Sequence, residues 1–128
     1  MVSPVVSRNR VLVVDDEPAV VQLLAAVVVE AGFKPDVACS AAEAMALLFR
    51  NADETCLVIS DIVMEDTDGI ELAKWVSAEY PNMPVLLVSG HFEGREQLKH
   101  LPPGVEFRQK PLSVQEIRNI VEQSCGIE

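Results

Sequence analysis

Short, uninterrupted apolar runs alternate along the chain with longer segments in which apolar residues recur every three or four positions. The clearest runs predict strands, and because no polar residues alternate within them, they are typical of strands buried on both faces of a parallel sheet. Two more polar runs predict strands at the edges of that sheet. The predicted strands are residues 11–14, 57–59 and 85–88, with weaker ones at 33–39 and 105–109.

The segments between these runs predict helices with clear start and stop signals. Asp16 is a possible N-cap of the first helix, and Gly32 follows its end. Ser40 and Ser113 each stand three residues before a glutamate, which is the spacing of a capping box. The helices predicted in this way are residues 18–30, 40–51, 69–80 and 113–126.

A further helix, the fourth in chain order, has weaker support. The segment from Gly90 to Gly104 contains few strongly apolar residues and is cut short by Pro102 and Pro103, so we expect a short or irregular helix there. Strand and helix otherwise alternate five times. This alternation predicts an α/β fold with right-handed crossovers, in which helices cover both faces of a doubly wound parallel sheet.

The size and charge of the chain limit the number of domains and the kinds of partner that we expect. Its 128 residues are expected to form one domain, residues 10–128, after an N-terminal tail of residues 1–9. The net charge of -10 and the lack of a basic stripe disfavour direct binding to nucleic acid, so proteins or cations are the expected partners. We expect no membrane span and no signal peptide, and hence a cytoplasmic location.

The three cysteines, Cys39, Cys56 and Cys125, are odd in number and far apart, and no CxxC pair is present for zinc or redox chemistry. We therefore expect them to be small packing residues in a reducing compartment. His91 and His100 have no Cys or His partners at ligand spacing, so they are expected to be surface residues rather than metal ligands.

Five side chains that could take part in binding or catalysis lie just beyond the predicted strands. In an open parallel sheet the carboxyl ends of the strands meet at one edge, where such folds bind ligands. Each residue alone has a simpler explanation, such as a helix cap, a strand end, a turn or an exposed loop. Their joint placement at four strand ends favours one shared site. These residues are Asp15, Asp16, Asp61, Ser89 and Lys110.

The crowding of three carboxylates predicts a cation site. Like charges a few Å apart raise one another's pKa, and a divalent cation removes that conflict. Mg²⁺ is suited to such a site, since it binds one or two carboxylates, keeps waters and accepts phosphate oxygens; Mn²⁺ is an alternative. Lys110 and Ser89 would then stabilise phosphoryl oxygens, and one carboxylate remains as a nucleophile that forms an aspartyl phosphate.

Four short motifs together resemble the receiver domain of two-component response regulators, over residues 10–125. They occur in the order and at the spacing of that family, and the set is far more specific than any single motif. The resemblance implies a flavodoxin-like three-layer α/β/α sandwich with a five-stranded sheet of order 2-1-3-4-5. The motifs are residues 13–18, 60–64 with 68–69, 88–90 and 107–111.

The resemblance also implies roles for the acidic residues. Asp61 corresponds to the phosphoacceptor. Asp15 and Asp16 correspond to residues that hold Mg²⁺ together with Asp61 and the backbone carbonyl of Val63.

The remaining motif residues would bind the phosphoryl group and report its presence. Ser89 and Lys110 correspond to the residues that contact the phosphoryl oxygens. Phe107 corresponds to an aromatic switch whose ring turns inward when the hydroxyl residue moves toward the phosphate. The peptide bond between Lys110 and Pro111 is expected to be cis.

The function implied is that of a phosphorelay switch, not an enzyme acting on a separate substrate. It would take a phosphoryl group from a histidine kinase or a histidine phosphotransfer protein, and catalyse only its own phosphotransfer and dephosphorylation. Phosphorylation would change its affinity for a downstream protein. We expect a monomer or a phosphorylation-dependent dimer that acts by docking, or a receiver module of a hybrid histidine kinase.

Two other functions stay open from the residues alone. One is a phosphorylation-independent adaptor with the same fold, although the intact acidic cluster argues against it. The other is a Mg²⁺-dependent phosphohydrolase of the haloacid-dehalogenase kind, which would need a second aspartate where Val63 stands. Val63 and His91 flank the expected path of the attacking water, and the apolar Val63 predicts slow self-dephosphorylation.

Overall fold

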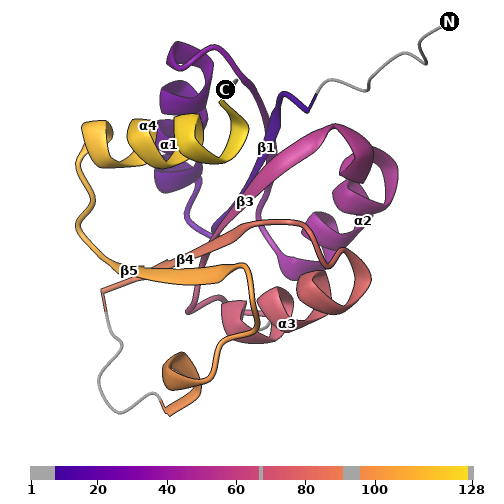
Figure 1. Cartoon of the computed structure of the whole chain (residues 1–128). Coiled ribbons are helices and arrows are strands. Elements are labelled where there is room, and N and C mark those ends of the chain that lie inside the picture. The colour runs from indigo at the N-terminus through magenta and orange to yellow at the C-terminus, as the bar shows by residue number, and fades with distance from the viewer. Residues whose placement is uncertain (1–7, 67, 91–95, 127–128) are drawn as a thin grey trace, which may run out of the picture.

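The computed structural model describes residues 8–66, 68–90 and 96–126. It contains one five-stranded parallel sheet of order β2-β1-β3-β4-β5, so the order 2-1-3-4-5 is confirmed (Figure 1). The predicted strand positions are also correct to within about two residues. The strands are β1 (Arg10–Val14), β2 (Lys34–Ala38), β3 (Thr55–Asp61), β4 (Val85–Ser89) and β5 (Val105–Gln109).

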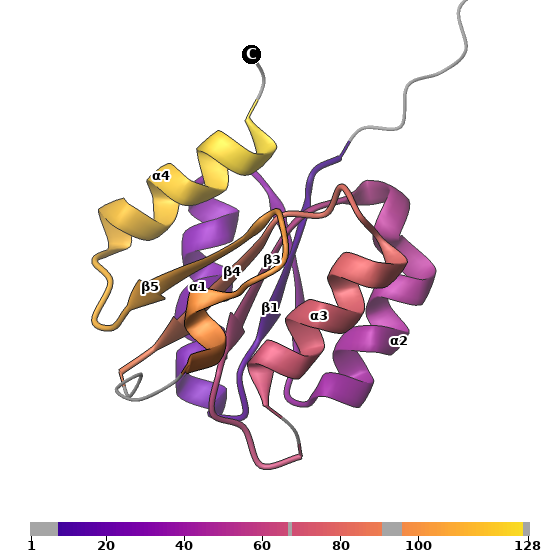
Figure 2. The same ribbon diagram turned by 60° about the horizontal axis from the view of Figure 1, so that its bottom comes forward.

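Helices cover both faces of the sheet. Figure 2 shows α1 and α4 on one side of the strands and α2 and α3 on the other, which makes the predicted three-layer sandwich. Two short 3-10 helices, η1 and η2, complete the described elements. The helices are α1 (Pro18–Glu30), α2 (Ala41–Asn51), η1 (Ala52–Glu54), α3 (Gly69–Glu79), η2 (Glu96–Lys99) and α4 (Val114–Cys125).

The central strands are buried on both faces, which explains their uninterrupted apolar sequence. In β1, Leu12 and Val14 belong to the core under α2 and α3, whereas Val11 and Val13 belong to the core under α1 and α4. All four side chains are at most 1% exposed. Because successive side chains of a strand point to opposite faces, an apolar residue is needed at every position.

The serine caps hold two helix starts, although only one capping box is complete. Ser113 Oγ accepts a hydrogen bond from Glu116 N, and a Glu116 carboxylate oxygen accepts one from Ser113 N. Ser40 Oγ likewise accepts from Glu43 N, but the Glu43 carboxylate accepts from Cys39 N, one residue earlier than a capping box requires. The Ser40 side chain therefore caps α2, while the Glu43 side chain binds the backbone of the residue before the cap.

The prediction that Asp16 caps the first helix is wrong. The N-cap of α1 is Glu17, whose side chain makes no cap hydrogen bond. Asp16 Oδ2 instead accepts a hydrogen bond from Glu65 N, in the loop after β3, at 3.0 Å. A long-range contact has replaced the local one, and it ties the loop after β1 to the loop after β3.

In the described part of the segment between β4 and β5 the helix is short, as predicted. Its described residues form only the 3-10 helix η2, and residues 91–95 lie outside the described part of the chain, His91 among them. Leu98 and Leu101 are partly buried against the core beneath α2 and α3. In the described residues, no helix has the length and apolar character needed to cross a membrane.

The prediction that all three cysteines are packing residues is only partly confirmed, since Cys56 and Cys125 are buried in the core but are bonded to each other. Cys56, in β3, and Cys125, at the end of α4, form a disulfide between residues 69 positions apart. Cys39 is a free, exposed cysteine rather than a core residue. Spacing in the sequence carried no signal for this pairing, because the fold alone brings the end of α4 to the start of β3.

Candidate phosphoryl and metal site

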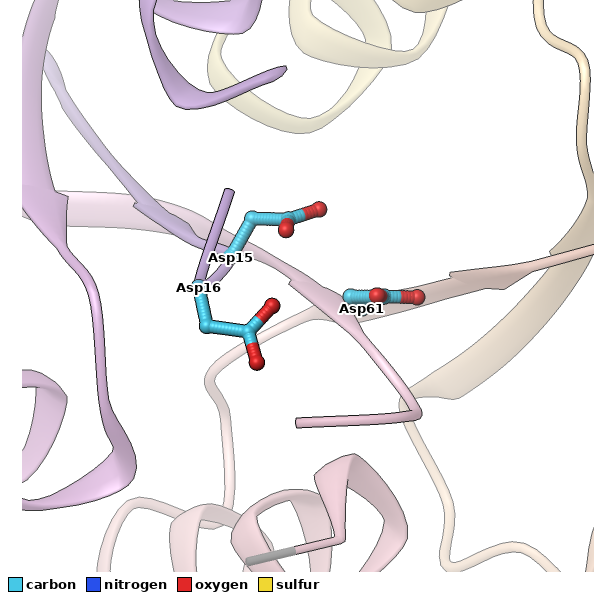
Figure 3. A group of neighbouring side chains, drawn as sticks. All are labelled: Asp15, Asp16 and Asp61. Carbon is cyan, nitrogen blue, oxygen red and sulfur yellow. The ribbon is translucent and has the colours of Figure 1, made fainter. Parts of the chain in front are cut away.

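Three carboxylates meet at the carboxyl ends of β1 and β3. Asp15 and Asp16 directly follow β1, and Asp61 is the last residue of β3 (Figure 3). One carboxylate oxygen from each lies within 4.8 Å of the others. Asp15 is only 1% exposed, so its charge is held in the interior. Such a set of hard oxygen donors fits a divalent cation such as Mg²⁺.

Lys110 supplies a positive charge beside these carboxylates. It follows β5, and its Nζ lies 3.7 Å from Asp15 Oδ2 and 3.6 Å from Asp61 Oδ1. Its backbone N–H donates a 3.0 Å hydrogen bond to the carbonyl of Ser89, the last residue of β4. The register of neighbouring parallel strands thus carries the ammonium group to the acidic cluster.

Backbone hydrogen bonds orient the carboxylates. Asp15 Oδ1 accepts from Glu17 N, and Asp61 Oδ1 accepts from Ile62 N, both at 2.9 Å. Within the described residues, no hydrogen bond or ion pair engages Asp61 Oδ2. One oxygen of Asp61 is therefore held in place by Ile62 and Lys110, while the other is available for chemistry.

A pocket of about 400 Å³ opens beside Asp61. Its lining residues come from the ends of β1, β3, β4 and β5. The predicted convergence of these strand ends is therefore confirmed. Ser89, only 2% exposed, lines this pocket. The lining residues are Asp16, Glu17, Asp61, Val63, Ser89, Gly90 and Lys110.

The structure also locates the remaining residues predicted for the site. Phe107, in β5, is partly buried against the core beneath α2 and α3 and does not line the pocket. The Lys110–Pro111 peptide bond is cis, as the resemblance implied. Val63 pairs with Asp68 in an isolated antiparallel bridge, and its side chain is 56% exposed.

Sequence reasoning missed how closely α3 approaches Asp61. Gly69, the first residue of α3, donates a 2.7 Å hydrogen bond from its backbone N–H to the carbonyl of Ile62. A Cβ at Gly69 would collide with the backbone oxygen of Asp61 and lie 2.8 Å from Ile62 Cα. The only signal in the sequence was its position in the Asp68-Gly69 part of the motif.

The charge environment makes Asp61 hold its proton more tightly in the folded protein. Burial raises the pKa of Asp61 above its ordinary value of 3.8; the Lys110 ammonium lowers this pKa, and the carboxylates of Asp15 and Asp16 raise it. The net direction is upward, so without a cation the ionised form is disfavoured. A bound cation would reverse this balance by neutralising the cluster.

In metal-free protein we expect Asp61→Asn to increase the free energy of unfolding at neutral pH, by on the order of 1 kcal/mol. Because the folded pKa of Asp61 is raised, the wild type loses stability as pH rises from 3.8 through the folded value, and the variant does not. Urea denaturation in EDTA at pH 4 and pH 7.5 measures this. A gain for the variant at pH 4 but none at pH 7.5 would contradict it; Asp53→Asn, at an exposed position, is the control.

Comparison with known proteins places this site in a family. The sequence profile of the response regulator receiver domain matches residues 11–122. The chain belongs to this family. The match spans the strand ends that carry Asp15, Asp61, Ser89 and Lys110, so every residue of the site falls within the receiver domain.

Relatives among curated proteins extend from plants to bacteria. The two-component response regulator ORR23 of Oryza sativa subsp. indica is 35% identical over 112 residues, which cover 87% of this chain and 16% of that protein. The putative response regulator NtrX-like of Rickettsia felis is 28% identical over 124 residues, covering 94% of this chain and 26% of that protein. The receiver domain thus spans a minor part of the length of these relatives.

Solved structures share the receiver fold over nearly the whole chain. The receiver domain of the hybrid histidine kinase CckA is 30% identical, with a TM-score of 0.76 and coverage of 91% of this chain and 98% of that chain. The beryllofluoride-activated NtrC4 receiver domain dimer is 26% identical, with a TM-score of 0.79 and coverage of 91% and 95%.

Proposed function

We propose that this receiver domain is a phosphoacceptor switch that carries an aspartyl phosphate on Asp61. The observation that carries the proposal is the placement of Asp61 in the lining of the pocket, beside Lys110 and two further carboxylates. Its Oδ1 is held by Ile62 N at 2.9 Å and lies 3.6 Å from Lys110 Nζ, with two further carboxylates beside it. This arrangement offers a nucleophilic oxygen, a cation site and a positive charge around one space.

The transfer step follows from these contacts. Asp61 Oδ2 attacks the phosphorus of a phosphohistidine; the bond between phosphorus and the imidazole nitrogen breaks, and its electron pair stays on that nitrogen. The Lys110 ammonium, already within 4 Å of two carboxylates, moves to a phosphoryl oxygen. The Ser89 hydroxyl donates to another. Both groups stabilise negative charge that develops on the phosphoryl oxygens.

The residues suited to hold Mg²⁺ are Asp15, Asp16 and Asp61, with the backbone carbonyl of Val63. Their carboxylates supply the hard oxygen ligands that this ion prefers, and the neighbouring pocket leaves room for waters and a phosphoryl oxygen. The ion would neutralise the acidic cluster and draw charge from the phosphoryl group. Mn²⁺ has the same ligand preference and is the alternative.

The proposed output is a shift between two arrangements of the loops after β4 and β5. Leu87 in β4 pairs with Phe107 in β5, and Lys110 N donates to the Ser89 carbonyl, so the two strand ends move together. A dianionic phosphoryl group drawn to Ser89 and Lys110 would bias this pair, with Phe107 turning inward. The surface presented to a downstream protein would change as a result.

The proposed partners are a histidine kinase or a histidine phosphotransfer protein as donor, and a downstream protein as target. A monomer that dimerises on phosphorylation agrees with the activated dimer of the NtrC4 receiver domain. A phosphohydrolase is not favoured, because the exposed Val63 stands where that class needs a second acid. A degenerate adaptor is not favoured either, because all three carboxylates and Lys110 are in place.

Metal removal tests the proposal directly. Incubation with Mg²⁺ and acetyl phosphate, or with phosphoramidate as a mimic of phosphohistidine, is expected to add one acid-labile phosphate, seen by intact mass. EDTA is expected to lower the rate by at least about 10-fold, because the carboxylates then repel the incoming phosphoryl group. No phosphate despite measured Mg²⁺ binding would favour an adaptor, and steady phosphate release from generic phosphoesters would favour a hydrolase.

A further inference from the structure

The disulfide between Cys56 and Cys125 lies at the opposite end of the sheet from the phosphoryl site. Cys56 is near the start of β3, whereas Asp61 ends the same strand. The Cα atoms of the two cysteines are 5.2 Å apart, within the range that a disulfide requires. The bond joins the last residue of α4 to the central strand of the sheet. Nothing in the phosphotransfer chemistry uses it.

The last turn of α4 is buried mainly through Cys125. From Val121 to the C-cap Gly126, Val121 and Cys125 are buried, Ser124 is half-buried, and Glu122, Gln123 and Gly126 are exposed. A small cavity of about 70 Å³ lies beside this turn, lined in part by Gln123, Ser124 and Leu57. Beyond Val121, Cys125 is the only fully buried residue of this helix, and helix ends open locally more readily than helix interiors.

The reduced form also has a place for a buried thiol. Cys56 Sγ lies 3.2 Å from the backbone oxygen of Arg10, which can accept the hydrogen of the free thiol. Cys56 is 5% exposed and Cys125 is 7% exposed, so as free thiols both would still pack as small apolar side chains. After reduction, the buried Cys56 thiol can therefore donate its hydrogen to the Arg10 carbonyl. The fold is thus compatible with either redox state.

We propose that Cys56 and Cys125 are a reversible redox pair that fastens the end of α4 to β3 when oxidised and, when reduced, leaves that end held by packing alone and able to open locally. Reduction proceeds by thiol–disulfide exchange with a low-molecular-weight thiol. Its thiolate attacks Cys125 Sγ after the last turn opens, the S–S bond breaks, and its electron pair leaves on Cys56 Sγ, which takes a proton. A second thiol resolves the mixed disulfide, giving two protein thiols and one small-molecule disulfide.

This switch would set the stability of the domain and the attachment of α4 without touching the reacting atoms. Cross-linking residues 69 positions apart restricts the unfolded chain, which stabilises the folded state. The other end of α4 begins with the Ser113 cap, three residues after Lys110. In the oxidised form α4 would be held covalently at its end as well as capped at its start, whereas in the reduced form only packing would hold its end.

The test uses the full chain, equilibrated under native conditions in buffers of reduced and oxidised glutathione, then quenched in acid, unfolded and alkylated so that every free thiol reacts. We expect one reactive thiol, Cys39, in the oxidised form and three in the reduced form, interconverting reversibly by intact mass. The oxidised form should melt roughly 10–15 °C higher. Amide exchange in the last turn of α4 should be faster after reduction, while phosphate incorporation from acetyl phosphate continues in both forms.

Cys39→Ser is the matched control, because it removes the exposed thiol and should keep the difference in Tm between redox states. Cys125→Ser and Cys125→Ala should each abolish that difference, whatever their own stability. The proposal is overturned if three thiols react in oxidising buffer, since the bond then does not form. It is equally overturned if reduction occurs only in denaturant, since the bond is then a permanent cross-link.

Discussion

Asp61→Asn is expected to lower phosphate incorporation from acetyl phosphate by at least about 100-fold in the presence of Mg²⁺. The reason is chemical: an amide oxygen is a poor nucleophile at phosphorus, while the shape of the side chain is conserved. The contacts from Ile62 N and Lys110 Nζ to Oδ1 remain possible in the variant, so the pocket should persist. Intact mass under mild conditions measures the incorporation.

The controls for this experiment separate the nucleophile from general charge effects. Asp53→Asn removes one negative charge at an exposed position in η1 and should phosphorylate at the wild-type rate. Lys110→Ala should retain the nucleophile but react more slowly, because the phosphoryl oxygens lose their positive partner. Full incorporation in Asp61→Asn would place the phosphate on another residue and remove the basis of the proposed function.

Gly69→Ala is expected to lower the free energy of unfolding by about 3 kcal/mol and also to lower the rate of phosphate incorporation. The added Cβ would meet backbone atoms of Asp61 and Ile62, which cannot move aside as a flexible side chain would. Either α3 shifts away from the sheet or the end of β3 is displaced, and Asp61 is carried with it. Urea denaturation and the acetyl phosphate assay measure the two effects.

Gly32→Ala is the matched control for this substitution. Gly32 follows α1 with φ of +96°, and no atom lies within 4 Å of the added Cβ, so the cost is backbone strain alone. That strain amounts to about 1 kcal/mol and should leave the phosphorylation rate unchanged. If both variants lose the same stability and neither changes phosphorylation, the close approach of α3 to β3 has no part in shaping the site.

Most of the architecture and the membership of the site could be predicted from the sequence. Uninterrupted apolar runs such as Val11 to Val14 identify strands buried on both faces, because a pleated strand between two helix layers needs an apolar residue at every position. The positions of the strand ends then predict that Asp15, Asp61 and Lys110 are neighbours, because parallel strands bring their carboxyl ends to one edge. Both inferences rest on periodicity and chain direction, which are local properties.

The tertiary structure alone decided which distant groups meet. Asp16 binds Glu65 N rather than capping its own helix, and Cys125 pairs with Cys56 rather than only packing. Gly69 is required by its contact with the backbone of Asp61. Such contacts depend on strand register and on how each helix lies against the sheet, which no pattern within one segment encodes. The sequence by itself thus determined the elements and the residues of the site, and packing between distant segments decided the contacts that orient and anchor them.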